Sequence, residues 1–158
     1  MTETSTLAVH NTFVIERSYP HSPERIFAAL SQPSHKRQWY AEGDHDIEQF
    51  EMDFRVGGTE RFGYRFRPGH PIAGSQIVNH GTYQEIVPDS RIVMTAKMSL
   101  NGKTMMVQLA TVELMPTQAG TDLVLTHQGT FLDWEGGPQM IEGGWRALLE
   151  RLQAYLAQ

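Results

Sequence analysis

The sequence predicts an α+β fold in which a curved antiparallel sheet of about six to seven strands wraps a long C-terminal helix. A first strand near the N-terminus is followed by two short helical segments. From there to about residue 130, apolar and polar side chains alternate between turn signals, as they do in sequential hairpins. The final segment instead carries apolar side chains at helical spacing.

The N-terminal part is expected to form one strand and two short helices. The strand covers residues 11–19, after a polar segment, residues 1–10, that is expected to be flexible. Ser22 is typical of a helix N-cap and is followed by proline, which suits the first helical position. A second short helix begins at Pro33 and carries Trp39.

Six further strands are expected, separated by turns rich in glycine, proline, asparagine and aspartate. Asn101-Gly102 lies between two of them and is a strong hairpin signal. Because such connections are short, neighbouring strands are expected to be antiparallel. The expected strands cover residues 46–54, 59–67, 75–87, 91–99, 104–115 and 121–129.

The last helix is expected to begin near Pro138 and to cover the apolar face of the sheet. A bent sheet is not filled by one straight helix, so a cavity between the two is one alternative, and a solid core of large side chains is the other. Periodicity alone leaves both open. The apolar stripe of this helix consists of Ile141, Trp145, Leu148, Leu149, Leu152 and Leu156.

Composition excludes several classes of function. The length of 158 residues suits one domain, residues 1–158, and the net charge of −5 disfavours nucleic-acid binding. The chain has no cysteine, which excludes disulfides, thiolate metal sites and cysteine nucleophiles. No signal peptide or apolar run of membrane-spanning length is visible, so a cytoplasmic location without a membrane partner is expected.

No metal ion or cofactor is expected. The seven histidines show no zinc-binding spacing, and the acidic cluster Asp44–Glu48 lacks the pattern of a calcium site. Nucleophile and phosphate-binding motifs are also missing. An enzyme would therefore depend on a buried acid or base, and we regard enzymatic activity as the less favoured alternative. The candidates for that role are Glu51, Glu60, Tyr83, Glu85 and His127.

Candidate ligand-binding residues lie on the strand faces that are expected to point toward the last helix. Methionines there suit an adaptable apolar pocket, and Gln108 and His127 would supply polar groups. Trp39 and Trp134 are expected near the mouth of the cavity. The alternatives are that Trp39 anchors the second short helix and that Trp134 is an exposed loop residue. For each of the others, the alternative is an ordinary core residue. The set is Trp39, Phe62, Tyr64, Phe66, Tyr83, Met94, Ala96, Met98, Met106, Gln108, His127, Trp134, Trp145 and Leu149.

Five segments in a fixed order resemble a known family. They are FVIERSYPHSPERIFAALSQPSHKRQWY, FRVGGTERF, GTYQEIVPDSRIVMT, TDLVLTHQG and GGWRALLERLQAYL. Over residues 11–157, the chain resembles the START-like (SRPBCC) superfamily, in the branch of bacterial homologues of the activator of the heat-shock protein 90 ATPase. The resemblance implies a helix-grip fold with a hydrophobic cavity between the sheet and the last helix.

The residues and the resemblance together favour one function and leave two alternatives. The first is binding of a small apolar molecule, lipid-like or aromatic, in the cavity. The second is an enzyme of polyketide cyclase or dehydratase type acting in the same cavity. The third is a stress-related co-chaperone that acts through its surface. Long edge strands and exposed aromatic residues are compatible with a homodimer in each case.

Overall fold

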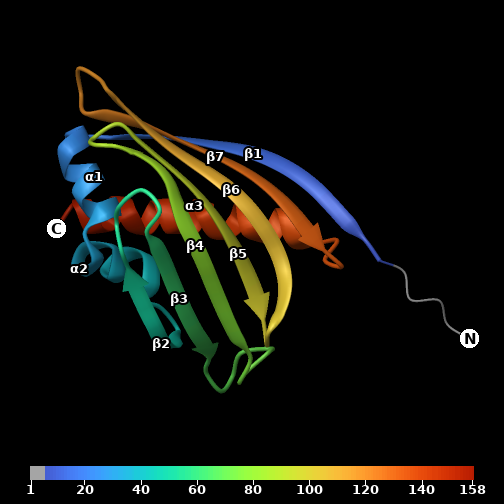
Figure 1. Cartoon of the computed structure of the whole chain (residues 1–158). Coiled ribbons are helices and arrows are strands. Elements are labelled where there is room, and N and C mark those ends of the chain that lie inside the picture. The colour runs from blue at the N-terminus through green and yellow to red at the C-terminus, as the bar shows by residue number, and fades with distance from the viewer. Residues whose placement is uncertain (1–5) are drawn as a thin grey trace, which may run out of the picture.

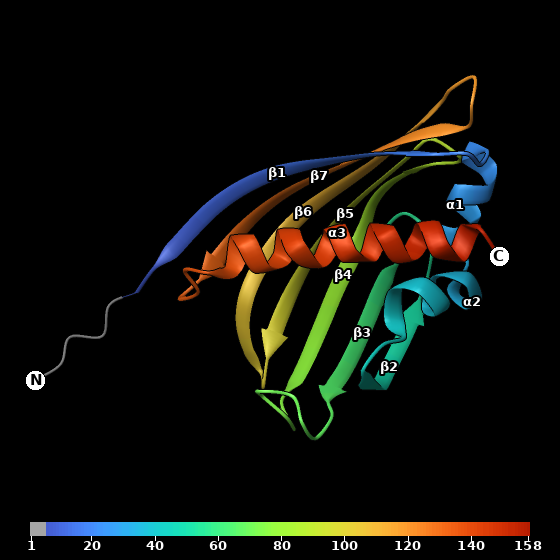
Figure 2. The same ribbon diagram turned by 180° about the vertical axis from the view of Figure 1, so that it is seen from behind.

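A computed structural model describes residues 6–158 and confirms the predicted α+β architecture. One antiparallel, seven-stranded sheet curves around α3 (Gly137–Leu156), which is the helix-grip arrangement (Figure 1). Two short helices, α1 (Pro23–Ser31) and α2 (Pro33–Lys36), lie beside the C-terminal end of α3 (Figure 2).

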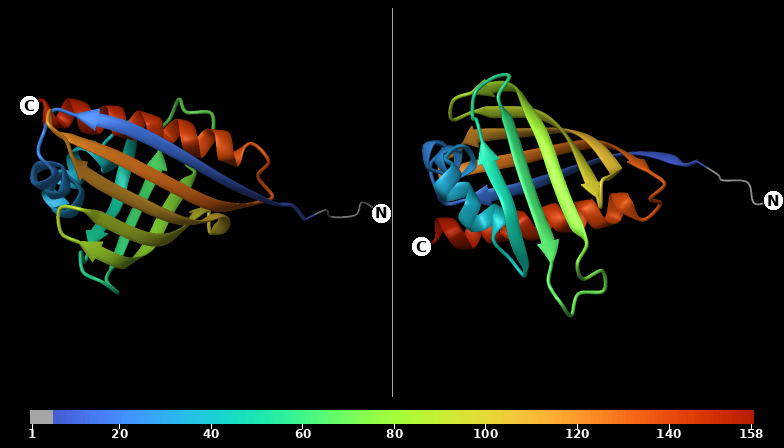
Figure 3. Two further views of the ribbon diagram at one scale, coloured as in Figure 1. Left: turned by 90° about the horizontal axis from the view of Figure 1, so that it is seen from above. Right: turned by 60° about the horizontal axis from the view of Figure 1, so that its bottom comes forward.

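The strands follow the chain order of consecutive hairpins, except that β1 pairs with β7. The order across the sheet is β1-β7-β6-β5-β4-β3-β2, so β1 and β2 form its edges. Figure 3 shows that α3 runs along the concave side of this sheet. The strands are β1 (Ala8–Tyr19), β2 (His45–Met52), β3 (Thr59–Phe66), β4 (Gln76–Val87), β5 (Arg91–Leu100), β6 (Lys103–Pro116) and β7 (Thr121–Leu132).

The first strand begins earlier than alternation predicts. Ala8 already pairs with Leu132, and the backbone N–H of Leu7 donates to Asp133 Oδ1 at 2.9 Å. Pairing with β7, which no local pattern reveals, extends the strand into the segment that was expected to be flexible. Residues 1–5 of that segment lie outside the described residues.

The helical region contains one element that periodicity does not reveal. Ser22 caps α1 as expected, since its Oγ accepts a hydrogen bond from the backbone N–H of Arg25 at 3.2 Å. The second helix, however, continues without a break into a π-helical turn, η1 (Arg37–Ala41). Such turns are rare and often occur at functional sites. This turn buries Trp39, and Nε1 of Trp39 donates to the backbone oxygen of Ala29 at 2.8 Å.

The Gly57-Gly58 turn connects β2 and β3 and is held against β4. Gly57 has a φ of +83°, and its N–H donates to the backbone oxygen of Tyr83 at 2.8 Å. The N–H of Tyr83 in turn donates to the backbone oxygen of Gly58 at 3.0 Å. A Cβ on Gly58 would collide with the backbone oxygen of Asp53.

We expect Gly58→Ala to lower the free energy of unfolding by about 1–3 kcal/mol, because a backbone atom cannot rotate away as a side chain can. Urea denaturation measures the effect. Gly143→Ala is the control, since a Cβ there meets nothing within 4 Å and replaces a helical glycine. That variant should be as stable as the wild type or up to about 1 kcal/mol more stable. Equal stability of Gly58→Ala and wild type would contradict the steric argument.

Candidate functional site

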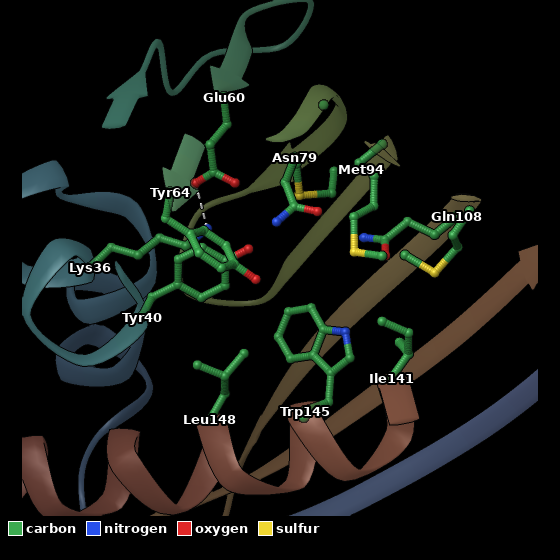
Figure 4. Close-up of a pocket in the computed structure, with 15 residues that line it drawn as sticks. Lys36, Tyr40, Glu60, Tyr64, Asn79, Met94, Gln108, Ile141, Trp145 and Leu148 are labelled. Atoms are coloured by element: carbon green, nitrogen blue, oxygen red, sulfur yellow. Dashed lines mark hydrogen bonds and ion pairs between the residues drawn. The ribbon is translucent and has the colours of Figure 1, made fainter. Parts of the chain in front are cut away.

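A cavity of about 180 Å³ lies between the concave face of the sheet and the N-terminal half of α3. Figure 4 shows side chains from the sheet, the α2–η1 segment and α3 pointing into a common space. The structure therefore combines both alternatives that the sequence left open. Leu149, Leu152 and Leu156 are buried in a packed core near the C-terminus of α3, whereas Ile141 and Trp145 are partly buried beside the cavity.

Small residues on facing elements leave this space open. Gly81 on β4 pairs with Ala96 on β5, so two adjacent positions on the concave face carry little side-chain volume. On α3, Gly144 also lines the cavity, and a Cβ there would meet nothing within 4 Å. Ala96 and Gly144 thus leave part of the cavity open, whereas a Cβ on Gly81 would collide with Met94 and the backbone oxygen of Thr95. Of these three positions, Ala96 alone was expected from the sequence.

Half of the predicted ligand-binding residues line the cavity. Most of them come from β5 and β6, where strict alternation indicates which face points inward. They make the wall rich in methionine, whose flexible side chain adapts to differently shaped ligands. These residues are Tyr64, Met94, Ala96, Met98, Met106, Gln108 and Trp145.

The other predicted residues pack elsewhere. Trp39 anchors η1 beneath α1 through its hydrogen bond to Ala29 and does not reach the mouth. Trp134 packs edge-on against Phe131, with ring centroids 5.9 Å apart, instead of covering the cavity. The rest belong to the packed interior or to the aromatic cluster on β3 that continues to His70. They are Phe62, Phe66, Tyr83, His127 and Leu149.

A buried ion pair forms the polar end of the cavity. Lys36 Nζ lies 2.6 Å from Glu60 Oε1, and the two residues are only 8% and 6% exposed. The hydroxyl of Tyr83 donates to the same carboxylate oxygen at 3.1 Å. The ammonium also lies 4.6 Å from the centroid of the Tyr40 ring, within cation–π distance. The ion pair thus has partners on several sides, and both of its residues line the cavity.

Sequence reasoning missed Lys36 and Tyr40 as lining residues, and it named Glu60 only as a candidate acid or base. A usable signal existed for Glu60, because it precedes Phe62 by two positions and shares the inward face of β3. No such signal existed for Lys36, which lies in a polar stretch and is turned inward where α2 meets η1. The remaining lining residues that were missed are Asn79, Gly81, Ile141, Gly144 and Leu148.

The phenol groups near the ion pair are strongly held in their protonated form. Burial, followed by the nearby charge of Glu60, raises the pKa of Tyr40 and of Tyr83 far above the ordinary value for tyrosine. Burial also raises the pKa of Tyr64. At neutral pH these hydroxyls are therefore uncharged hydrogen-bond donors and acceptors.

Gln108 and His127, which were both expected to supply polar groups to a ligand, are paired with each other, and only Gln108 lines the cavity. His127 Nε2 lies 2.9 Å from Gln108 Oε1, and because this oxygen can only accept, Nε2 carries the hydrogen. The ring of His127 is fully buried and stacks on Phe13, with ring centroids 4.6 Å apart. Burial lowers the pKa of His127 to about 4. The pair fixes the amide of Gln108, whose nitrogen donates to no described residue.

Other candidates do not contribute to this site. Glu51 and Glu85 are exposed, and Glu85 pairs with Arg91 on the surface. Across residues 6–158, no group of three or more histidine, aspartate or glutamate side chains is arranged to hold a metal ion. Over the same residues, no helix has both the length and the apolar character needed to cross a membrane.

Comparison with known proteins gives a family and several structural relatives. A family model described as "Activator of Hsp90 ATPase homolog 1-like protein" matches residues 20–157. A solved structure of an uncharacterised Rhizobium leguminosarum protein is 33% identical, with a TM-score of 0.90, over 98% of this chain and 99% of that one. A Rhizobium loti protein is 39% identical, with a TM-score of 0.85, over 94% of this chain and 99% of that one. A Chromobacterium violaceum protein is 26% identical, with a TM-score of 0.78, over 94% of this chain and 99% of that one. None of the curated proteins searched matches the chain.

Proposed function

The chain belongs to the family of Activator of Hsp90 ATPase homolog 1-like proteins, and we propose that it binds a small aromatic molecule in the cavity between the sheet and α3. The observation that carries the proposal is the cavity itself, which joins a wall of methionines and Trp145 to a polar end. This combination of apolar lining with a few convergent polar groups is typical of ligand sites.

The volume of the cavity favours a single aromatic ring over a long acyl chain. An engineered apolar cavity of about 150 Å³ in another protein holds benzene. The space here, about 180 Å³, accommodates a ring with a small substituent. Burying about 150 Å² of ring surface contributes about 4 kcal/mol. Association also costs translational and rotational freedom, so without polar contacts we expect a dissociation constant no lower than about 1 mM. Titrations should therefore extend to millimolar concentrations.

We expect Gly144→Leu to weaken binding of toluene at least about tenfold, because Gly144 lines the cavity and a leucine side chain would take up part of its space. Binding is followed by the fluorescence of Trp145, which lines the same space, and by calorimetric titration. The matched control is Gly143→Leu, one residue earlier on α3. It makes the same change in helix propensity at an exposed position that does not line the cavity.

Two outcomes would contradict the proposal. The first is saturable binding that is equally strong in wild type, Gly144→Leu and Gly143→Leu, which would place the ligand elsewhere. The second is the absence of saturable binding for every small aromatic probe while the protein unfolds cooperatively. A fluorescence change that persists in Trp145→Phe would show that another tryptophan reports the binding.

A further inference from the structure

We propose, on the basis of that function, that the natural ligand is a neutral aromatic molecule carrying a hydroxyl group, which hydrogen-bonds to Lys36 and Glu60 at the polar end of the cavity. The proposal thereby assigns a role in ligand binding to the buried ion pair of Lys36 and Glu60. Buried ion pairs are often replaceable by apolar residues without loss of stability.

The charge balance of the lining selects against a charged ligand. Among the residues that line the cavity, Lys36 and Glu60 are the charged ones, and their formal charges cancel. A carboxylate ligand would bring a negative charge for which the lining holds no free counter-charge, beside a glutamate that repels it. A neutral molecule with a polar substituent meets neither penalty.

The hydrogen-bonding capacity left in the ion pair selects a hydroxyl. Glu60 Oε1 accepts from both Lys36 and Tyr83, whereas Oε2 receives no hydrogen bond from any described residue. Figure 4 shows this second oxygen on the side that faces Asn79. Lys36 has three N–H donors, and its described partners are the carboxylate and the ring of Tyr40. A hydroxyl can donate to Oε2 and accept from Lys36, whereas a carbonyl can only accept.

Two further hydroxyls extend the same site. The OH groups of Tyr40 and Tyr64 make no hydrogen bond to any described residue, although both side chains line the cavity. Both side chains are only partly buried and line the cavity, so these hydroxyls are available to a ligand there. Burial keeps both of them protonated because it raises their pKa. They therefore add hydrogen-bonding capacity without adding charge.

The test compares four small probes on the wild-type protein by calorimetric titration at pH 7. Toluene and phenol differ by the hydroxyl, and benzamide and benzoate have the same shape but differ in charge. We expect phenol to bind about tenfold tighter than toluene, and benzamide at least about tenfold tighter than benzoate. Toluene and phenol binding equally, or benzoate binding as tightly as benzamide, would overturn the inference and leave the proposed function intact. If none of the four probes binds, both proposals are wrong.

A charge variant tests the role of the ion pair directly. Glu60→Gln leaves Lys36 without its counter-charge, so the affinity ratio of benzoate to benzamide should rise about tenfold or more. Glu48→Gln is the matched control, because it removes the carboxylate of the exposed pair with Arg65 outside the cavity. An unchanged ratio in Glu60→Gln, or an equal rise in Glu48→Gln, would overturn the inference. The wild-type comparison decides it alone if Glu60→Gln does not fold.

Discussion

Replacing Lys36 with methionine is expected to lower the free energy of unfolding by about 3–5 kcal/mol. The side chain of Glu60 is 7% exposed, and without the ammonium 2.6 Å away its charge has no ionic partner in the interior. Methionine keeps most of the apolar stem of lysine, so the loss is one of charge compensation and not of packing. Urea denaturation at pH 7, followed by circular dichroism, measures the effect.

Two further variants separate this explanation from ordinary packing loss. The double variant Lys36→Met/Glu60→Leu removes both charges and should recover most of the lost stability. Arg65→Met removes the cation of an exposed pair, whose side chains are 44% and 37% exposed, and should cost less than about 1 kcal/mol. If Lys36→Met costs no more than Arg65→Met, the ion pair is not energetically buried.

The double variant also bears on why the ion pair is there. An apolar pair as stable as the wild type would mean that Lys36 and Glu60 are not needed for folding. Their place at the wall of a cavity would then be explained by what enters it. The same variant should lose the preference for phenol over toluene, because no charged hydrogen-bonding group remains at that end of the cavity. Measurements of stability and of ligand preference thus test the role of the Lys36–Glu60 ion pair independently.

The fold was predictable because its signals are local and repeated. Alternation along β5 and β6 indicates which residues face α3, and the apolar stripe of α3 indicates the matching helix face. The strands that the sequence predicts agree with the structure to within a few residues. The early start of β1 was not predictable in this way, because it depends on pairing with a strand more than one hundred residues later.

The site was predictable only where a regular strand carries it. Met94 and Gln108 line the cavity because alternation continues unbroken through their positions. Lys36 and Tyr40 depend on a π-helical turn, which has no recognisable period in the sequence. Gly144 was missed for a different reason: a cavity is made by absent side chains, and the helical pattern draws attention to the large ones.

Acidification from pH 7 to pH 4 is expected to remove about 3 kcal/mol of stability through His127 alone. Burial lowers the pKa of His127 to about 4 in the folded protein, whereas an unfolded histidine titrates near its usual value of 6.5. Between these values the unfolded state binds more protons than the folded state, so stability falls as the pH decreases through this window. The neutral ring is retained because it is fully buried and stacked on Phe13.

The contribution of His127 is isolated by comparing the pH dependence of variants. His127→Leu should be less stable than wild type at pH 7, because it loses the hydrogen bond to Gln108, yet it should lose about 3 kcal/mol less between pH 7 and pH 4. His10→Leu, on the exposed face of β1, is the matched control for removing one histidine. If wild type and His127→Leu lose stability in parallel, the folded protein accommodates a protonated His127. Both ring nitrogens are donors in a protonated histidine, so Nδ1 would require an acceptor. Nδ1 of His127 is buried and has no partner among the described residues.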